Sequence, residues 1–98
     1  MNNIVGYQVT GDPSSGVLIG GTTDPIVIYG YNGTGTDGVV TLQNGSASGD
    51  KVYAQTAVLT SGEELTATFG FGIMFPNGCW YTNTSGSGAD VVYYKAVI

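Results

Sequence analysis

The chain has 98 residues and a net charge of −5, from seven acidic residues against two lysines, and it contains no histidine. Nucleic-acid binding through phosphate contacts needs a basic patch, which Lys51 and Lys95 cannot form, so nucleic acid and an anionic membrane surface are both excluded as partners. The lack of histidine removes the commonest general base and metal-binding side chain.

Size and composition predict one domain over residues 1–98. Hydrophobic residues make up 42% of the chain, which is enough for a core, and charged residues make up only 9%. The surface must therefore consist mainly of Ser, Thr, Asn, Gln and Gly. Cys79 is the single cysteine, so it has no partner for an internal disulfide, and we expect folding in a reducing cytoplasm. The sequence shows neither a signal peptide nor an apolar run long enough for a membrane span.

The order of apolar, β-branched and turn-forming residues predicts about eight β-strands and no helix. In chain order, the predicted strands cover residues 4–10, 17–19, 26–31, 39–43, 51–59, 64–75, 78–82 and 89–97. Asn-Gly or Asp-Gly pairs begin at Asn32, Asp37, Asn44 and Asn77, and each predicts a turn because these residues tolerate positive φ. Many short strands at about ten-residue spacing favour an all-β antiparallel sandwich or a barrel.

The longest predicted strand holds all three phenylalanines at alternate positions. Phe69, Phe71, Ile73 and Phe75 would share one face of this strand, and we expect that face to lie in the core. If Phe71 is buried, its replacement by Ala should cost about 3–5 kcal/mol. The intervening glycines, Gly70 and Gly72, predict a bulge or a bend in the strand.

The sequence offers little for catalysis or for metal binding. Glu63 and Glu64 are adjacent, so on a strand they would point to opposite faces and could not act together as an acid and base pair. The five Asp residues stand among Gly, Ser and Thr and lack the spacing of a calcium-binding loop, which favours structural turns. We therefore predict no enzyme activity, no catalytic residue, no cofactor and no metal.

Four aromatic residues outside the phenylalanine run are the candidate contact residues. They are Tyr29, Tyr31, Trp80 and Tyr81. Three interpretations stay open for them: core packing, an interface with a partner or a second subunit, or a platform on which a sugar ring stacks. Alternation along the strand would place Trp80 on one face, and Cys79 and Tyr81 on the other.

Several segments resemble a family of small structural proteins found in the virions of tailed phages. The matching segments run from Gly16 to Tyr94 and consist of turn and core residues. They are Gly16-Val17-Leu18, Asp37-Gly38-Val39-Val40-Thr41-Leu42-Gln43-Asn44-Gly45, residues 69–78, and Ala89-Asp90-Val91-Val92-Tyr93-Tyr94. The loop at residues 20–25 is longer than the usual connection in this family.

The resemblance implies a β-sandwich of jelly-roll type that serves as a capsid decoration, or cement, protein. Such a protein would be made in the cytoplasm of the bacterial host, form a homo-oligomer in the virion, and stabilise the head by bridging neighbouring subunits of the major capsid protein. The alternatives are a carbohydrate-binding or receptor-binding module on a virion appendage, and a tail or neck component. The resemblance implies no catalytic residue.

Overall fold

The computed structural model describes residues 3–9, 14–20, 25–33, 37–58, 65–84 and 90–97, with the backbone alone at 37–38, 55–58 and 65. This part of the chain forms eight β-strands and no helix. The strands are β1 (Val5–Gln8), β2 (Val17–Ile19), β3 (Ile26–Gly33), β4 (Asp37–Asn44), β5 (Lys51–Val58), β6 (Leu65–Phe75), β7 (Cys79–Asn83) and β8 (Val91–Ala96). Each of them overlaps one predicted strand, so the all-β prediction is confirmed.

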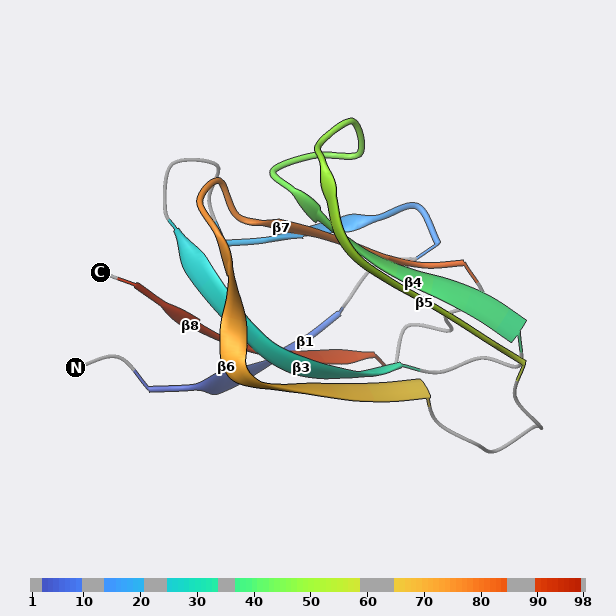
Figure 1. The fold of residues 1–98 in the computed structure, drawn as a ribbon, viewed down its shortest axis with the longest axis horizontal. Coiled ribbons are helices and arrows are strands. Elements are labelled where there is room, and N and C mark those ends of the chain that lie inside the picture. The colour runs from blue at the N-terminus through green and yellow to red at the C-terminus, as the bar shows by residue number, and fades with distance from the viewer. Residues whose placement is uncertain are drawn as a thin grey trace.

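The strands form two antiparallel sheets of four strands each. The first sheet has the order β1-β8-β3-β6, and the second has the order β2-β7-β4-β5. The two sheets lie as two layers in Figure 1, and buried side chains from both of them pack into one core. This arrangement is that of a β-sandwich.

The strand pairs are nested along the chain. β1 pairs with β8, β2 with β7, β3 with β6, and β4 with β5, all antiparallel. Two further antiparallel pairings, of β3 with β8 and of β4 with β7, complete the two sheets. The first strand of the chain therefore lies beside the last one, and the whole fold depends on contacts between residues far apart in sequence.

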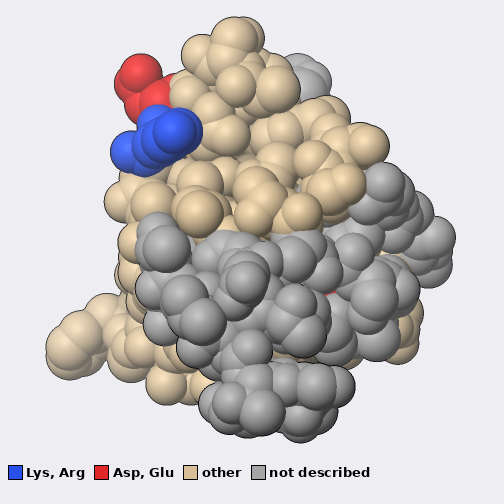
Figure 2. Space-filling view, turned by 90° about the vertical axis from the view of Figure 1, so that its right-hand side faces the viewer, with Lys and Arg blue, Asp and Glu red and all other residues tan. Residues whose placement is uncertain are grey.

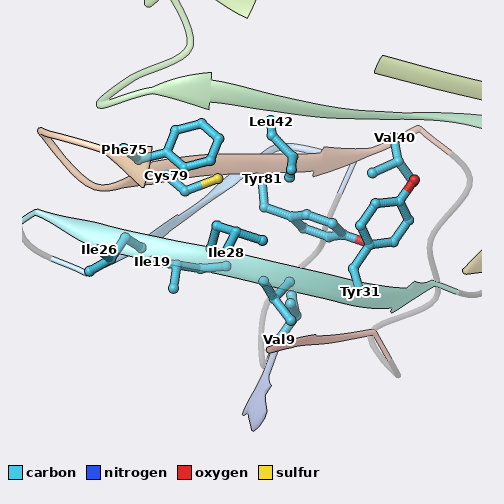
Figure 3. Close-up of a cluster of buried hydrophobic side chains, with 11 residues drawn as sticks. Val9, Ile19, Ile26, Ile28, Tyr31, Val40, Leu42, Phe75, Cys79 and Tyr81 are labelled. Carbon is cyan, nitrogen blue, oxygen red and sulfur yellow. The ribbon is translucent and has the colours of Figure 1, made fainter. Parts of the chain in front are cut away.

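The core lies between the sheets, with Phe75, Cys79 and Ile26 toward one end and Tyr31, Tyr81 and Val40 toward the other (Figure 3). Phe75 is completely buried, and Phe69 and Ile73 are partly buried and pack against the core. These three positions agree with the predicted core face of the long strand. The fully buried or nearly buried apolar residues are Val9, Ile19, Ile26, Ile28, Tyr31, Val40, Leu42, Phe75, Cys79, Tyr81 and Val92.

Two of the four predicted Asn-Gly or Asp-Gly turns are present, and they touch each other. Gly45 and Gly78 have φ values of +76° and +80°, as expected for turn glycines. The N–H of Gly45 donates to the carbonyl of Gly78 at 3.0 Å, and the N–H of Asn77 donates to Oδ1 of Asn44 at 3.2 Å. The β4–β5 turn is thus fixed to the β6–β7 turn.

The other two predicted turns are wrong, because their residues belong to strands. Asn32 lies in β3 and pairs with Thr66 of β6, while Asp37 lies in β4 and pairs with Val58 of β5. Ladder pairing with neighbouring strands has overridden the local turn preference of these sequences.

An irregularity in the pairing of β3 with β6 moves Phe71 out of the core. Ile28 pairs with Ile73 and Gly30 pairs with Thr68, so residues 69–72 of β6 lie opposite Tyr29 alone. Within this bulge Gly72 has φ +78°, a conformation that L-residues rarely adopt. Phe71 is consequently fully exposed, at 101% of its reference area, and its prediction as a core residue is wrong. The glycines do mark a bulge, as the sequence predicts.

The described part of the chain contains no helix that is long and apolar enough to cross a bilayer.

Candidate interaction surface

A patch of apolar and aromatic side chains covers the outer face of the first sheet beside the bulge. We call it the Phe71 surface, and it consists of Val27, Tyr29, Phe71, Met74 and Lys95. Val27 pairs with Met74 of β6 on one side and with Lys95 of β8 on the other, so these three residues form a row across three strands. Their neighbours Ile26, Ile28 and Phe75 are buried, so alternation directs the row away from the core.

The bulge joins Phe71 to this row. A Cβ atom placed on Gly72 would lie 2.2 Å from Cγ1 of Val27 and 3.1 Å from Cε1 of Tyr29. The backbone of Gly72 therefore rests directly on the side chains of Val27 and Tyr29, and any larger residue would displace them. Phe71 immediately precedes Gly72 in the chain and is fully exposed.

The Phe71 surface is unusually apolar for a face in contact with water. Phe71 is fully exposed and Met74 is 55% exposed, and on the same face of the sheet Tyr93 is 42% exposed. Single exposed apolar residues are common, whereas several of them in one region of a sheet are a candidate site of interaction. A fully exposed aromatic ring and an exposed, flexible Met side chain are both well suited to enter an apolar pocket of a partner.

Lys95 is the only charged side chain among the described residues on the outer face of the first sheet. Its Nζ atom lies 5.7 Å from the centroid of the Tyr29 ring, within the range of a cation–π interaction. Charge is also sparse elsewhere: in the view of Figure 2, the coloured acidic and basic side chains gather near the top, and the remaining described surface is almost entirely uncharged. The Phe71 surface is thus apolar with a single positive charge.

Two of the four candidate residues, Tyr31 and Tyr81, are buried, which agrees with core packing and contradicts the interface and sugar-platform interpretations for them. Tyr31 is 1% exposed and Tyr81 is 0% exposed, and their ring centroids are 6.1 Å apart inside the sandwich. The bulge explains the difference between neighbouring tyrosines: it leaves Tyr29 partly exposed and turns Tyr31 inward. Burial raises the pKa of both buried hydroxyls, and hydrogen bonds to Tyr53 and Asp90 raise them further.

Tyr81 belongs to a buried polar cluster that connects the two sheets. Its hydroxyl donates to Oδ2 of Asp90 at 2.6 Å, and Nδ2 of Asn83 donates to the same oxygen at 2.9 Å. Tyr81 and Asn83 belong to β7 of the second sheet, while Asp90 directly precedes β8 of the first sheet. The backbone carbonyl of Asp90 also accepts from the N–H of Val9 at 2.9 Å. This cluster binds the sheets together and is shielded from solvent, so it serves the fold.

Trp80 lies on the outer face of the second sheet, as alternation predicts, while Cys79 and Tyr81 are buried. Its ring covers Gly16, where an added Cβ would lie 2.4 Å from the indole. Its cross-strand neighbours are Leu18 and Gln43. The side-chain amide of Gln43 donates to the carbonyls of Ala47 at 2.9 Å and Gly49 at 3.1 Å, so its donors already serve the β4–β5 turn.

The four predicted contact residues therefore do not form one site. Tyr29 is on the outer face of the first sheet, Trp80 is on the outer face of the second, and Tyr31 and Tyr81 lie between the sheets. The sequence-based prediction missed Met74 and Lys95, which join Tyr29 on the Phe71 surface. Alternation within β6 places Met74 on the opposite face from Phe75, and alternation within β8 places Lys95 on the outer face. Their proximity, however, depends on which strands pair, and the local sequence does not reveal that.

The described residues hold no arrangement typical of a metal site or of a nucleophile. Among them, no group of three or more His, Cys, Asp or Glu residues could hold a metal ion. Cys79 is buried, and burial raises the pKa of its thiol to about 12 despite a hydrogen bond from the backbone at Gln43 that lowers it. A thiol in this state is unreactive at neutral pH.

Comparison of the chain with protein families, curated proteins and solved structures finds no match.

Proposed function

We propose that this chain is a structural protein of a tailed-phage virion that decorates the capsid and works by contact with the major capsid protein. The observation that carries the proposal is the full exposure of Phe71 on an apolar surface held by a bulge. The bulge interrupts an otherwise regular strand pair and moves a phenylalanine from the interior into water. A fold gains no stability from this, whereas a binding surface gains an aromatic anchor.

The mechanism follows from the chemistry of the Phe71 surface. Phe71 and Met74 would enter an apolar depression on one capsid subunit, and Lys95 would meet a carboxylate at its rim. Binding would remove apolar area from water and add attachment between neighbouring capsid subunits. The head would then resist heat and osmotic shock better because the subunits are bridged.

We further propose that the β-sandwich is a jelly roll. The nested pairs β1–β8, β2–β7, β3–β6 and β4–β5, distributed over two four-stranded sheets, support this assignment. The topology agrees with the fold that the phage resemblance implies. It bears on architecture alone, since one fold hosts many functions.

The test is to purify phage heads made with and without this chain. Heads made with it should contain the chain in a fixed ratio to the major capsid protein, and heads made without it should open at a lower temperature. A chain that is absent from purified virions, or heads of unchanged heat resistance, would contradict the proposal. Mass spectrometry of separated heads and tails would also distinguish decoration from a tail or neck component.

A second candidate function is carbohydrate binding on a virion appendage, and the partly exposed indole of Trp80 favours it. A sugar ring stacked on this indole should quench its fluorescence, and Trp80→Ala should abolish binding. Tyr81 cannot contribute to stacking because it is buried. A broad glycan array without a response would exclude this candidate and leave the capsid contact standing.

A further inference from the structure

The sequence contains three Asn-Gly pairs, which begin at Asn32, Asn44 and Asn77, and the fold gives them three different environments. In such a pair the asparagine loses its amide group readily, because glycine has no side chain to hinder attack by its own backbone nitrogen. That nitrogen attacks Cγ of the preceding asparagine. The attack requires that the asparagine side chain can rotate and that no strong hydrogen bond holds the N–H of the glycine.

Asn32 is enclosed by paired strands. It belongs to β3, where it pairs with Thr66 of β6 on one side and with Val91 of β8 on the other, and its Oδ1 atom is buried. Gly33 is also buried and pairs with Leu65 of β6. Attack at Asn32 would therefore require that β3 first separates from its neighbours.

Asn44 is held at its backbone and at its side chain. Its N–H donates to the carbonyl of Asp50 at 3.0 Å, and its Oδ1 atom accepts from the N–H of Asn77 at 3.2 Å. The nitrogen that would attack it, in Gly45, donates to the carbonyl of Gly78 at 3.0 Å. The target and the nucleophile of this pair are thus both fixed.

Asn77 is the exception among the three. It is exposed in the β6–β7 turn, and its side chain makes no hydrogen bond with the described residues, since only its backbone N–H contacts Asn44. The N–H of Gly78 donates to the carbonyl of Phe75 at 3.3 Å. This distance is beyond the usual range of about 2.7–3.2 Å, so the bond holds the nitrogen weakly.

We propose that Asn77 is a modification site, at which the folded protein deamidates with water as the co-reactant. The nitrogen of Gly78 loses its proton and bonds to Cγ of Asn77, and Nδ2 leaves with that proton as ammonia. Water then opens the succinimide ring, adding its hydroxyl to one ring carbonyl and its hydrogen to the nitrogen. Opening at Cγ gives aspartate, and opening at the main-chain carbonyl gives isoaspartate. The site uses no residue of the Phe71 surface.

Isoaspartate at position 77 releases the β4–β5 turn. Its backbone runs through the former side chain, which adds one carbon between the nitrogen of residue 77 and the carbonyl of Gly78. These two groups bind Asn44 and Gly45 respectively, so the longer backbone cannot keep both hydrogen bonds. Aspartate at the same position leaves the backbone spacing unchanged and keeps both.

The first test is to incubate the wild-type chain at mildly alkaline pH, in buffer and in concentrated urea, and to follow deamidation by mass spectrometry. Chymotrypsin separates the three pairs into different peptides, because it cleaves after Tyr31, Leu42 and Tyr53. In urea the three pairs should react at similar rates. In buffer Asn77 should react at least about tenfold faster than Asn32 and Asn44, which need local opening first. Similar rates in buffer, or faster reaction at either of the other two, would overturn the proposal.

The second test measures release of the turn through hydrogen exchange of the Gly45 amide, followed by NMR. Exchange should be faster in aged wild type that contains isoaspartate at position 77. It should stay slow in aged Asn77→Gln, which lacks the reactive side chain, and in Asn77→Asp, which carries the new charge without the added carbon. Slow exchange in the isoaspartate form, or equally fast exchange in Asn77→Asp, would refute the role of the added carbon.

Discussion

Strand β6 places one aromatic ring in the core and another in the solvent. The buried ring stabilises the fold, and the exposed ring is available for binding. Phe75 lies completely within the core, while Phe71, four residues earlier, is fully exposed. Both occupy odd positions in the same strand, so alternation alone would place them together. The bulge opposite Tyr29 and the positive φ of Gly72 separate them. The interior ring contributes to stability, and the exterior ring contributes only when a partner covers it.

The largest expected effect is on the stability of the interior ring. Phe75→Ala should lower the free energy of unfolding by about 3–5 kcal/mol, because it leaves a cavity in the core. Phe71→Ala should lower it by less than about 0.5 kcal/mol, since the ring has no interior contacts to lose. Urea denaturation of the two variants checks the contrast. Equal losses would mean that Phe71 is buried and would remove the basis of the proposed surface.

The interior also contains the polar cluster of Tyr81, Asn83 and Asp90. Disrupting this cluster should lower the free energy of unfolding by nearly as much as Phe75→Ala. Asp90→Ala removes the acceptor for the Tyr81 hydroxyl and for Nδ2 of Asn83, so we expect a loss of about 3 kcal/mol. Asp90→Asn keeps one carbonyl oxygen as an acceptor and should lose less. Thermal and urea unfolding of both variants measures this difference. If both variants match the wild type, the cluster does not hold the two sheets together.

A smaller effect is expected at the bulge that separates the two environments. Gly72→Ala forces an L-residue into positive φ, which costs about 1–2 kcal/mol, and also crowds Val27. Gly70→Ala is the matched control, because a Cβ at Gly70 would meet nothing within 4 Å. The control should be close to neutral in urea denaturation. A Gly72→Ala variant as stable as this control would indicate a different conformation of the bulge.

Alkaline pH should gradually lower the free energy of unfolding, because ionisable groups are buried in the interior. The thiol of Cys79 ionises near its ordinary pKa of 9.0 in the unfolded chain but only near 12 in the folded one. Above pH 9 the unfolded state therefore releases a proton that the folded state retains, and stability falls by about 1.4 kcal/mol per pH unit until about pH 12. Tyr31 and Tyr81, whose pKa values are also raised, add to the loss above pH 10.

Denaturation at pH 8, 9 and 10 measures this slope, and Cys79→Ala should reduce it between pH 9 and 10. A slope that the substitution leaves unchanged would mean that the thiol is accessible to solvent in the folded state.

The sequence predicts the strands of this fold well but their relative placement poorly. Alternating apolar residues and turn formers located all eight strands, and alternation alone placed Trp80 on the opposite face from Cys79 and Tyr81. Which strands are neighbours depends on contacts between distant segments, such as β1 with β8, that no local pattern encodes. The Phe71 surface depends on this pairing, because Val27, Met74 and Lys95 meet only when β3 lies between β6 and β8.

The bulge shows the same limit within a single strand. Gly70 and Gly72 predict an irregularity in β6. That four residues of β6 lie opposite a single residue of β3 follows from how the two strands pair, which the sequence of β6 alone does not show. From the sequence alone, alternation places Phe71 in the core, and core packing, an interface and a sugar platform all stay open for Tyr29 and Tyr31. Asn32 and Asp37 were assigned to turns for a related reason, since pairing with β6 and β5 extends the strands through them.

The most direct test of the central claim compares the two outer faces of the sandwich in binding to phage heads. Heads that lack the chain would be incubated with wild type, Phe71→Ala or Trp80→Ala, and the bound fraction would be measured by sedimentation. Loss of one central aromatic anchor typically weakens an interface by 2 kcal/mol or more, so Phe71→Ala should bind at least about 30-fold more weakly. Trp80→Ala should bind like the wild type. Unchanged binding by Phe71→Ala, with binding lost in Trp80→Ala, would contradict the account.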